Sequence, residues 1–141
     1  MGRTGKKSCR SQLLAMYLID TDIIIWILRG NKKYEELLQN LKDKDLLSIS
    51  TITIAEIYKN IYPSEIVKTE NVLNELLTWD VTPSVAKQGG LYWQEYVKHL
   101  KNLNITDCLI ASTANVNNLT LVSLNTKHFP MKDIKTLNPT H

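Results

Sequence analysis

Several features that mark common protein classes are scarce in this sequence of 141 residues. It contains only two cysteines, and none of its apolar runs approaches the roughly 18 residues that span a membrane. Cys9 lies in a polar segment and Cys108 in an apolar one, with no CxxC spacing, which argues against a disulfide framework and against a zinc or redox centre. We therefore expect a soluble protein of the cytoplasm.

Motifs for nucleotide binding and for secretion are also missing. The chain has five glycines and neither a GxGxxG motif nor a P-loop, so a nucleotide-binding Rossmann module is a weak alternative. The first fifteen residues are basic, but their apolar part, 13–15, is too short for a signal peptide. We interpret residues 1–15 as a disordered or non-native leader and residues 16–141 as a single domain.

The positive net charge comes from that leader. The whole chain has a formal charge of +3, with 17 basic and 14 acidic residues. Four basic residues lie in the leader, so 13 remain against all 14 acidic residues and the body carries about −1. The domain therefore lacks the overall basic charge of many nucleic-acid-binding proteins, and any nucleic acid would have to be bound locally.

The apolar pattern alternates between two kinds of segment. Short runs rich in Ile, Leu and Val, at 16–20, 46–50 and 120–124, predict buried parallel strands. Apolar residues three or four positions apart predict amphipathic helices at 34–41, 66–77 and 109–116. A further helix, apolar throughout, is expected at 23–28, directly after the first strand. With two further short strands, one after Asp80 and one at 134–137, we expect an α/β fold: a three-layer α/β/α sandwich around a parallel sheet of four to five strands.

Four polar residues fall at the ends of these predicted elements. Asp20 ends the first strand, and Glu56 lies in the first turn of the helix that follows the second strand. Asp107 opens the helix that precedes the next core strand, and Asn125 ends that strand. Because ligands of open parallel sheets bind at the carboxyl ends of the strands, we expect these side chains to converge there.

Converging carboxylates repel one another unless a cation offsets their charge. Ligands that are all oxygen atoms suit Mg²⁺ or Mn²⁺. Such an ion activates water and stabilises charge on a phosphate that is attacked, so the pattern indicates hydrolysis of phosphodiester bonds.

Each residue also has a purely structural interpretation. Thr53 and Glu56 have the spacing of a helix capping box, and Asp22 is suited to be a helix N-cap. Asp107 at a helix start is favoured by the helix dipole alone, and Asn125 is a common turn residue. The joint placement of these residues, rather than any one of them, favours the functional interpretation.

Several segments together resemble the PIN-domain family, and within it the VapC-type toxins. They read MYLIDTDIIIWILRGN, LSISTITIAEIYKNIY, ITDCLIASTANVNNLTLVSLNTKHF and DIKTL, in the order and at the spacings of that family. The resemblance implies that Asp20, Glu56 and Asp107 are the acidic metal ligands. It also places Ser123 at the family's hydroxyl position and Asn125 at the fourth acidic position, where many relatives have Asp. An amide there adds no negative charge, so we expect one metal ion to be bound firmly and a second only weakly.

The resemblance further implies an endoribonuclease that is the toxin of a toxin–antitoxin pair. Its substrate would be RNA, often a structured RNA such as tRNA. Cleavage would leave the phosphate on the 5′ end of the new product. It would form a homodimer and bind a protein antitoxin whose C-terminal segment blocks the acidic pocket. For phosphate contacts at the rim we expect Arg29 and Lys127, whereas we interpret His128 as a packing or turn residue.

Two other functions are compatible with the sequence. Asp20-Thr21-Asp22 reproduces the DxD signature of haloacid-dehalogenase-like phosphatases, in which Asp20 would be a nucleophile. That family also needs an acidic pair late in the chain, where this sequence has Asn125. Asn125 equally leaves open a non-catalytic PIN relative whose acidic pocket only binds RNA or a protein.

Overall fold

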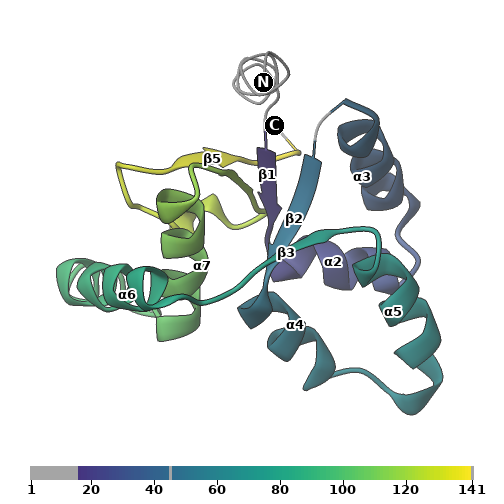
Figure 1. The fold of residues 1–141 in the computed structure, drawn as a ribbon, viewed down its shortest axis with the longest axis horizontal. Helices are drawn as coiled ribbons and strands as arrows, with labels where there is room; N and C mark the ends of the chain where they lie inside the picture. The colour runs from purple at the N-terminus through teal and green to yellow at the C-terminus, as the bar shows by residue number, and fades with distance from the viewer. Residues whose placement is uncertain (1–15, 45, 141) are drawn as a thin grey trace, which may run out of the picture.

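A computed structural model describes residues 16–44 and 46–140, and the predicted leader lies outside them. The elements in chain order are β1 (Met16–Ile19), α2 (Thr21–Leu28), α3 (Lys32–Lys44), β2 (Leu46–Ser50), α4 (Thr51–Tyr58), η1 (Pro63–Glu65), α5 (Ile66–Leu73), β3 (Leu77–Trp79), α6 (Pro83–Tyr96), α7 (Ile105–Val116), β4 (Thr120–Val122), η2 (Thr126–His128) and β5 (Lys135–Leu137) (Figure 1).

The strands form one parallel sheet of five strands in the order β3-β2-β1-β4-β5. The chain builds outward from β1 to β3 on one side and then returns to place β4 on the other side of β1. The strand order therefore reverses between β1 and β4, which is where open parallel sheets bind ligands.

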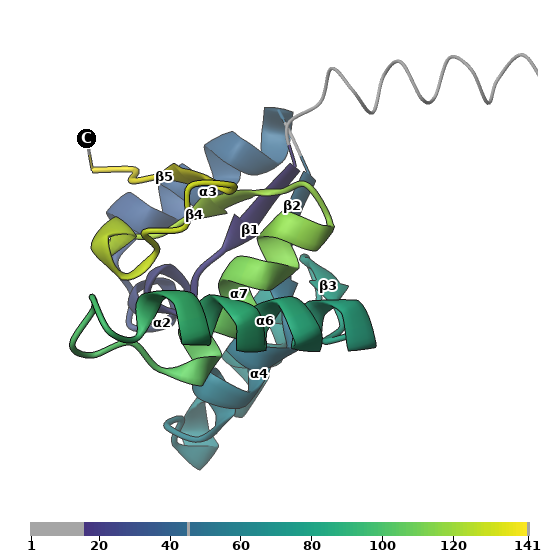
Figure 2. The same ribbon diagram turned by 90° about the vertical axis from the view of Figure 1, so that its left-hand side faces the viewer.

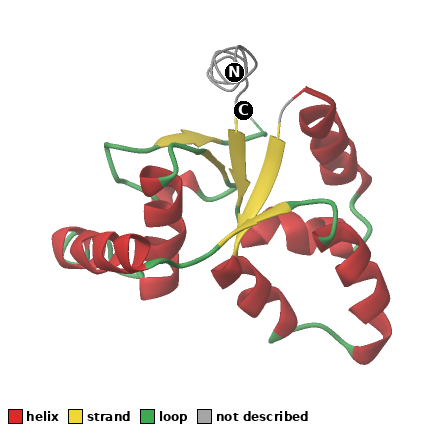
Figure 3. Cartoon of the chain, viewed as in Figure 1, coloured by secondary structure: helices red, strands yellow, loops and turns green. Residues whose placement is uncertain are grey.

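Helices cover both faces of this sheet, in the three layers that the sequence predicted (Figures 1 and 3). Neighbouring residues of a strand point to opposite faces. Leu18 and Leu121 accordingly pack in the cluster that includes Ile110 of α7, whereas Ile19 and Val122 pack in the cluster that includes Ile23 of α2. Helices α6 and α7 lie on one face, with α6 crossing α7 (Figure 2), and α2, α3 and α5 lie on the other.

Two expectations about individual elements were wrong. The short strand expected after Asp80 lies before it, at Leu77–Trp79, because α5 ends at Leu73 instead of continuing through Leu77. The helix α6 was not predicted at all. Its apolar contacts come from the buried residues Val85, Gly89 and Tyr92, and a pair of glycines in its centre weakens the helical pattern.

No helix within 16–44 and 46–140 is long and apolar enough to cross a membrane. Cys108 is a buried free thiol, and burial raises its pKa to about 11, which keeps it protonated at neutral pH. Cys9 lies outside the described residues.

Candidate active site

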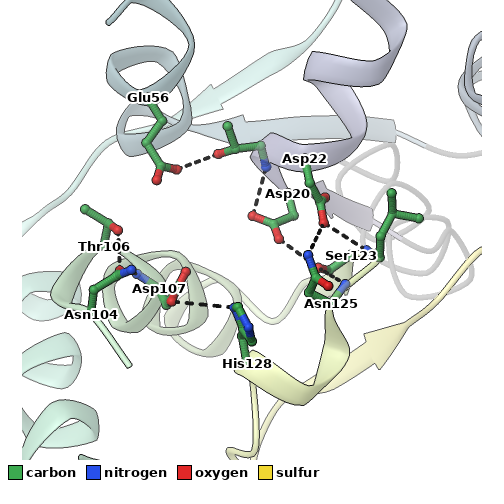
Figure 4. A network of polar contacts seen from close by, with 11 residues as sticks. Asp20, Asp22, Glu56, Asn104, Thr106, Asp107, Ser123, Asn125 and His128 are labelled. Atoms are coloured by element: carbon green, nitrogen blue, oxygen red, sulfur yellow. Dashed lines mark hydrogen bonds and ion pairs between the residues drawn. The ribbon is translucent and has the colours of Figure 1, made fainter. Parts of the chain in front are cut away.

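The candidate site lies where the strand order reverses, at the carboxyl ends of β1 and β4 (Figure 4). Asp20 follows β1 directly, and its backbone N–H donates to the carbonyl of Val122 in β4. Ser123 follows β4 and is fully buried. The two residues are 103 positions apart in sequence, and the Ser123 hydroxyl donates to Asp20 Oδ2 over 2.7 Å.

Asp20 is the N-cap of α2 and is 8% exposed. Its Oδ1 accepts a hydrogen bond of 2.8 Å from the backbone N–H of Thr21. Burial, with a smaller contribution from the negative charge of Asp22, raises the pKa of Asp20 to about 7. A carboxyl group with this pKa exchanges its proton near neutral pH, so a cation can compete with that proton.

Asp22 is not the N-cap that the structural interpretation assumed, because Asp20 occupies that position. Its Oδ2 instead accepts hydrogen bonds from the backbone N–H of Leu124 (3.3 Å) and from the side-chain amide of Asn125 (3.2 Å). Its Oδ1 is buried and has no hydrogen-bond partner among the described residues. Burial raises the pKa of Asp22. A buried carboxylate oxygen without a hydrogen bond has lone pairs available to coordinate a cation.

Glu56 does not form the capping box with Thr53. The N-cap of α4 is Ser50, whose hydroxyl accepts from the backbone N–H of Ile52, so Glu56 lies in the second turn and not in the first. One oxygen of Glu56, Oε1, accepts a hydrogen bond of 2.6 Å from the Thr21 hydroxyl. Glu56 is thereby linked to the start of α2, next to Asp20.

Asp107 is the third residue of α7, whose N-cap is Asn104. The Asn104 side chain accepts from the backbone N–H of Asp107 at 2.9 Å. Burial raises the pKa of Asp107, and the negative charge of Glu56 raises it further, while His128 lowers it. His128 Nδ1 lies 4.0 Å from Asp107 Oδ2, so this histidine of η2 faces the site.

The carboxylates of Asp20, Glu56 and Asp107 face a common space (Figure 4). Their charges affect one another, since Asp107 raises the pKa of Asp20 and Glu56 raises that of Asp107. No three His, Cys, Asp or Glu side chains in the part of the chain that the structure describes are close enough to ligate one metal ion as they are placed. The chemistry of the donors fits Mg²⁺ or Mn²⁺, and the side chains would have to move closer together to share an ion.

Two predicted rim residues lie near this site. Arg29 is exposed and lines a pocket of about 220 Å³ together with Asp22, Ile25 and Trp26. Lys127 is exposed in η2, two residues after Asn125. The contact of the Thr21 hydroxyl with Glu56 was not predicted from the sequence, although the position of Thr21 between two aspartates at a predicted strand end was a signal for it.

Comparisons with known proteins agree with this arrangement. The sequence model of the PIN domain matches residues 17–135. Ribonuclease VapC10 of Mycobacterium tuberculosis is 30% identical over 116 residues, covering 82% of this chain and 87% of the relative. Toxin FitB of Neisseria gonorrhoeae is 31% identical over 139 residues, covering 89% of this chain and 99% of the relative.

Solved structures of the same kind share the fold. VapBC2 from Rickettsia felis, bound to a DNA fragment from its promoter, matches with a TM-score of 0.75 at 24% identity, over 87% of this chain and 98% of that one. VapBC-1 from nontypeable Haemophilus influenzae matches with a TM-score of 0.74 at 25% identity, over 89% of this chain and 99% of that one. The family match spans most of the described residues, including all the candidate site residues. The chain therefore belongs to the PIN domain family, and within it to the VapC type.

Proposed function

We propose that this protein is a Mg²⁺- or Mn²⁺-dependent endoribonuclease and the toxin of a toxin–antitoxin pair, acting in the cytoplasm. One observation carries the proposal: Asp20, Glu56 and Asp107 come from three distant segments, and their carboxylates face one space at the carboxyl end of β1. The names of the relatives support the activity, since they are called ribonucleases and a toxin. The similar solved structures include toxin–antitoxin complexes, which supports a protein antitoxin as partner.

Asp20, Glu56 and Asp107 would hold the cation. When bound, such an ion makes water more nucleophilic and offsets the charge of the attacked phosphate. Ser123 fixes the orientation of Asp20 by donating to its Oδ2, and it is itself held by the backbone N–H of Asn125, 3.0 Å from Ser123 Oγ.

Substrate binding is assigned to the rim of the site. Arg29 and Lys127 are exposed, carry positive charge and would contact phosphates of the RNA near the acidic space. The domain body is close to neutral, so these contacts would contribute a large part of the affinity for RNA. A homodimer would place two such sites in one particle.

The alternative of a haloacid-dehalogenase-like phosphatase is overturned by the family match. The non-catalytic alternative remains an outcome of the experiment below. The non-catalytic alternative is based on Asn125, because the Asn125 amide donates a hydrogen bond to Asp22 and adds no fourth negative charge.

The experiment is cleavage of labelled RNAs, tRNA included, by the purified protein with Mg²⁺ or Mn²⁺. We expect the wild type to cleave RNA and to leave 5′-phosphate ends on the products. The cleavage rate should fall by at least about 100-fold, as is typical when a catalytic group is removed, in Asp20→Asn, Glu56→Gln and Asp107→Asn. Asp80→Asn is the matched control, since Asp80 is exposed and follows the edge strand β3. Absence of cleavage with either metal, across several RNAs, would favour a binding protein.

A further inference from the structure

Thr21 lies between the two aspartates of the site and is almost completely buried, with 8% of its surface exposed. Its hydroxyl oxygen is 2.6 Å from Glu56 Oε1 and 3.1 Å from the hydroxyl oxygen of Thr53. Thr53 is fully buried in α4, one helical turn before Glu56. Three polar groups from two helices are therefore in contact beside Asp20.

The number of protons determines the direction of these bonds. A hydroxyl group has one proton to donate, and an ionised carboxylate can only accept. The short contact of 2.6 Å is typical of a hydroxyl that donates to a carboxylate, so Thr21 donates to Glu56. The Thr53 hydroxyl is then left to donate to Thr21, and the chain of bonds runs from Thr53 through Thr21 to Glu56.

Burial alone does not require such an arrangement. Thr69 of α5 is also fully buried, and its hydroxyl has no hydrogen-bond partner within the described part of the chain. A buried threonine hydroxyl in this protein can thus remain unpartnered. The contact of Thr21 with Glu56 is for this reason a specific feature of the site.

We propose that Thr21, supported by Thr53, is a positioning residue that keeps the Glu56 carboxylate beside Asp20, from where it would bind the cation. This inference rests on the proposed function. The bond occupies Oε1 and leaves Oε2 for the cation, while it removes rotational freedom from a flexible side chain that is only partly buried. Groups that orient a metal ligand in this way typically change metal affinity by about 10- to 100-fold.

The experiment measures Mn²⁺ affinity by calorimetry and RNA cleavage for a series of threonine variants. Thr21→Val keeps the shape of the side chain and removes the donor, and we expect it to weaken Mn²⁺ binding about 10-fold. Thr21→Ser restores the donor and should bind Mn²⁺ within about threefold of the wild type. At saturating Mn²⁺, Thr21→Val should lower kcat and leave KM for RNA unchanged.

Thr69→Val is the matched control, because it removes a buried hydroxyl that contacts nothing in the site, and we expect it to bind Mn²⁺ as the wild type does. If Thr21→Val does not fold, Thr53→Val replaces it, with a smaller expected loss of affinity. Wild-type affinity in Thr21→Val, or an equal loss in Thr69→Val, would overturn the role of Thr21.

Failure of the proposed function gives a different result. A wild type that binds Mn²⁺ but cleaves no RNA, with weakened Mn²⁺ binding in Thr21→Val, would overturn the ribonuclease and support the positioning role. A wild type that cleaves RNA, with unchanged Mn²⁺ binding and kcat in Thr21→Val, would overturn the positioning role alone. A wild type that binds no Mn²⁺ would overturn both.

Discussion

Asp20 is the carboxylate of the site that the fold buries most completely, and its burial has a measurable cost. The folded state keeps the proton of Asp20 up to a pKa of about 7, whereas the unfolded chain loses it near 3.8. Between these two pKa values the folded state binds more protons than the unfolded state, so the stability of the ion-free protein falls as pH rises. Above pH 7 the ionised, buried Asp20 lowers the free energy of unfolding by its full amount.

We predict from this that Asp20→Asn is more stable than the wild type at pH 8 in the presence of a chelator. The expected gain in the free energy of unfolding is about 2 kcal/mol, and it should largely vanish at pH 4. Denaturant unfolding at the two pH values measures it, with Asp80→Asn as control. A variant that is less stable than the wild type at pH 8 would mean that Asp20 is not destabilising when ionised.

Asn125 gives a second prediction at this scale. Asn125→Asp removes the amide that donates to Asp22 and places a negative charge beside that carboxylate. The ion-free protein should lose about 1 kcal/mol of stability, and Mn²⁺ binding should tighten about 10-fold because the added carboxylate is a charged ligand. Thermal unfolding and a Mn²⁺ titration measure the two effects. Unchanged Mn²⁺ affinity would show that position 125 lies outside the cation site.

The sequence predicted the location of the acidic residues better than their hydrogen bonds. Asp20 and Asp107 could be located because strand ends and helix starts follow from local patterns. The bonds from Thr21 to Glu56 and from Asn125 to Asp22 could not be predicted, since each joins segments that meet only in the folded sheet. The Thr53–Glu56 spacing suggested a local capping box, but the Ser50 hydroxyl caps α4 and leaves Glu56 free for the contact with Thr21.

At the scale of elements, α7 carries Asp107 and packs closely against α6. The contact depends on Gly89, where an added Cβ would lie 2.8 Å from Leu109 Cδ2 and 3.3 Å from Ser112 Oγ. The Ser112 hydroxyl donates to the carbonyl of Val85 at 2.8 Å, so it cannot move away without breaking that bond. A side chain at position 89 would therefore press on Leu109 and Ser112 of α7.

The adjacent glycine provides the control for a prediction about this contact. At Gly90 an added Cβ meets nothing within 4 Å. Gly90→Ala should raise the free energy of unfolding by about 1 kcal/mol through helix propensity, whereas Gly89→Ala should lower it by about 1 kcal/mol through overpacking. Denaturant unfolding of the two variants measures the difference. Equal stability of the two would contradict the close packing of α6 on α7.

These glycines also explain why α6 escaped prediction from the sequence. Its buried positions 85, 89 and 92 have helical spacing, but one of them is a glycine and carries no hydrophobic signal. The position of β3 was missed for a related reason. Leu76 and Leu77 continue the spacing of α5, and only the tertiary structure separates the buried Leu76 from the strand that begins at Leu77.

At the scale of the whole molecule, the sheet brings the site together. Asp20 and Ser123 come from neighbouring central strands, and the helices that follow β2 and precede β4 carry Glu56 and Asp107 to the same end. The convergence of these residues could be predicted from the sequence because parallel strands place their carboxyl ends along one edge of the sheet. The body of the protein is close to neutral, so the site is a local concentration of negative charge. A divalent cation would relieve the repulsion within it.

Titration of the chelator-treated protein with Mn²⁺, followed by calorimetry at pH 7.5, tests this central claim most directly. We expect one ion per chain to bind firmly to the wild type and to Asp80→Asn. Affinity should be at least about 10-fold weaker in Asp20→Asn, Glu56→Gln and Asp107→Asn, because each loses a charged ligand. Wild-type Mn²⁺ affinity in these three variants would contradict the claim that the three carboxylates share one cation.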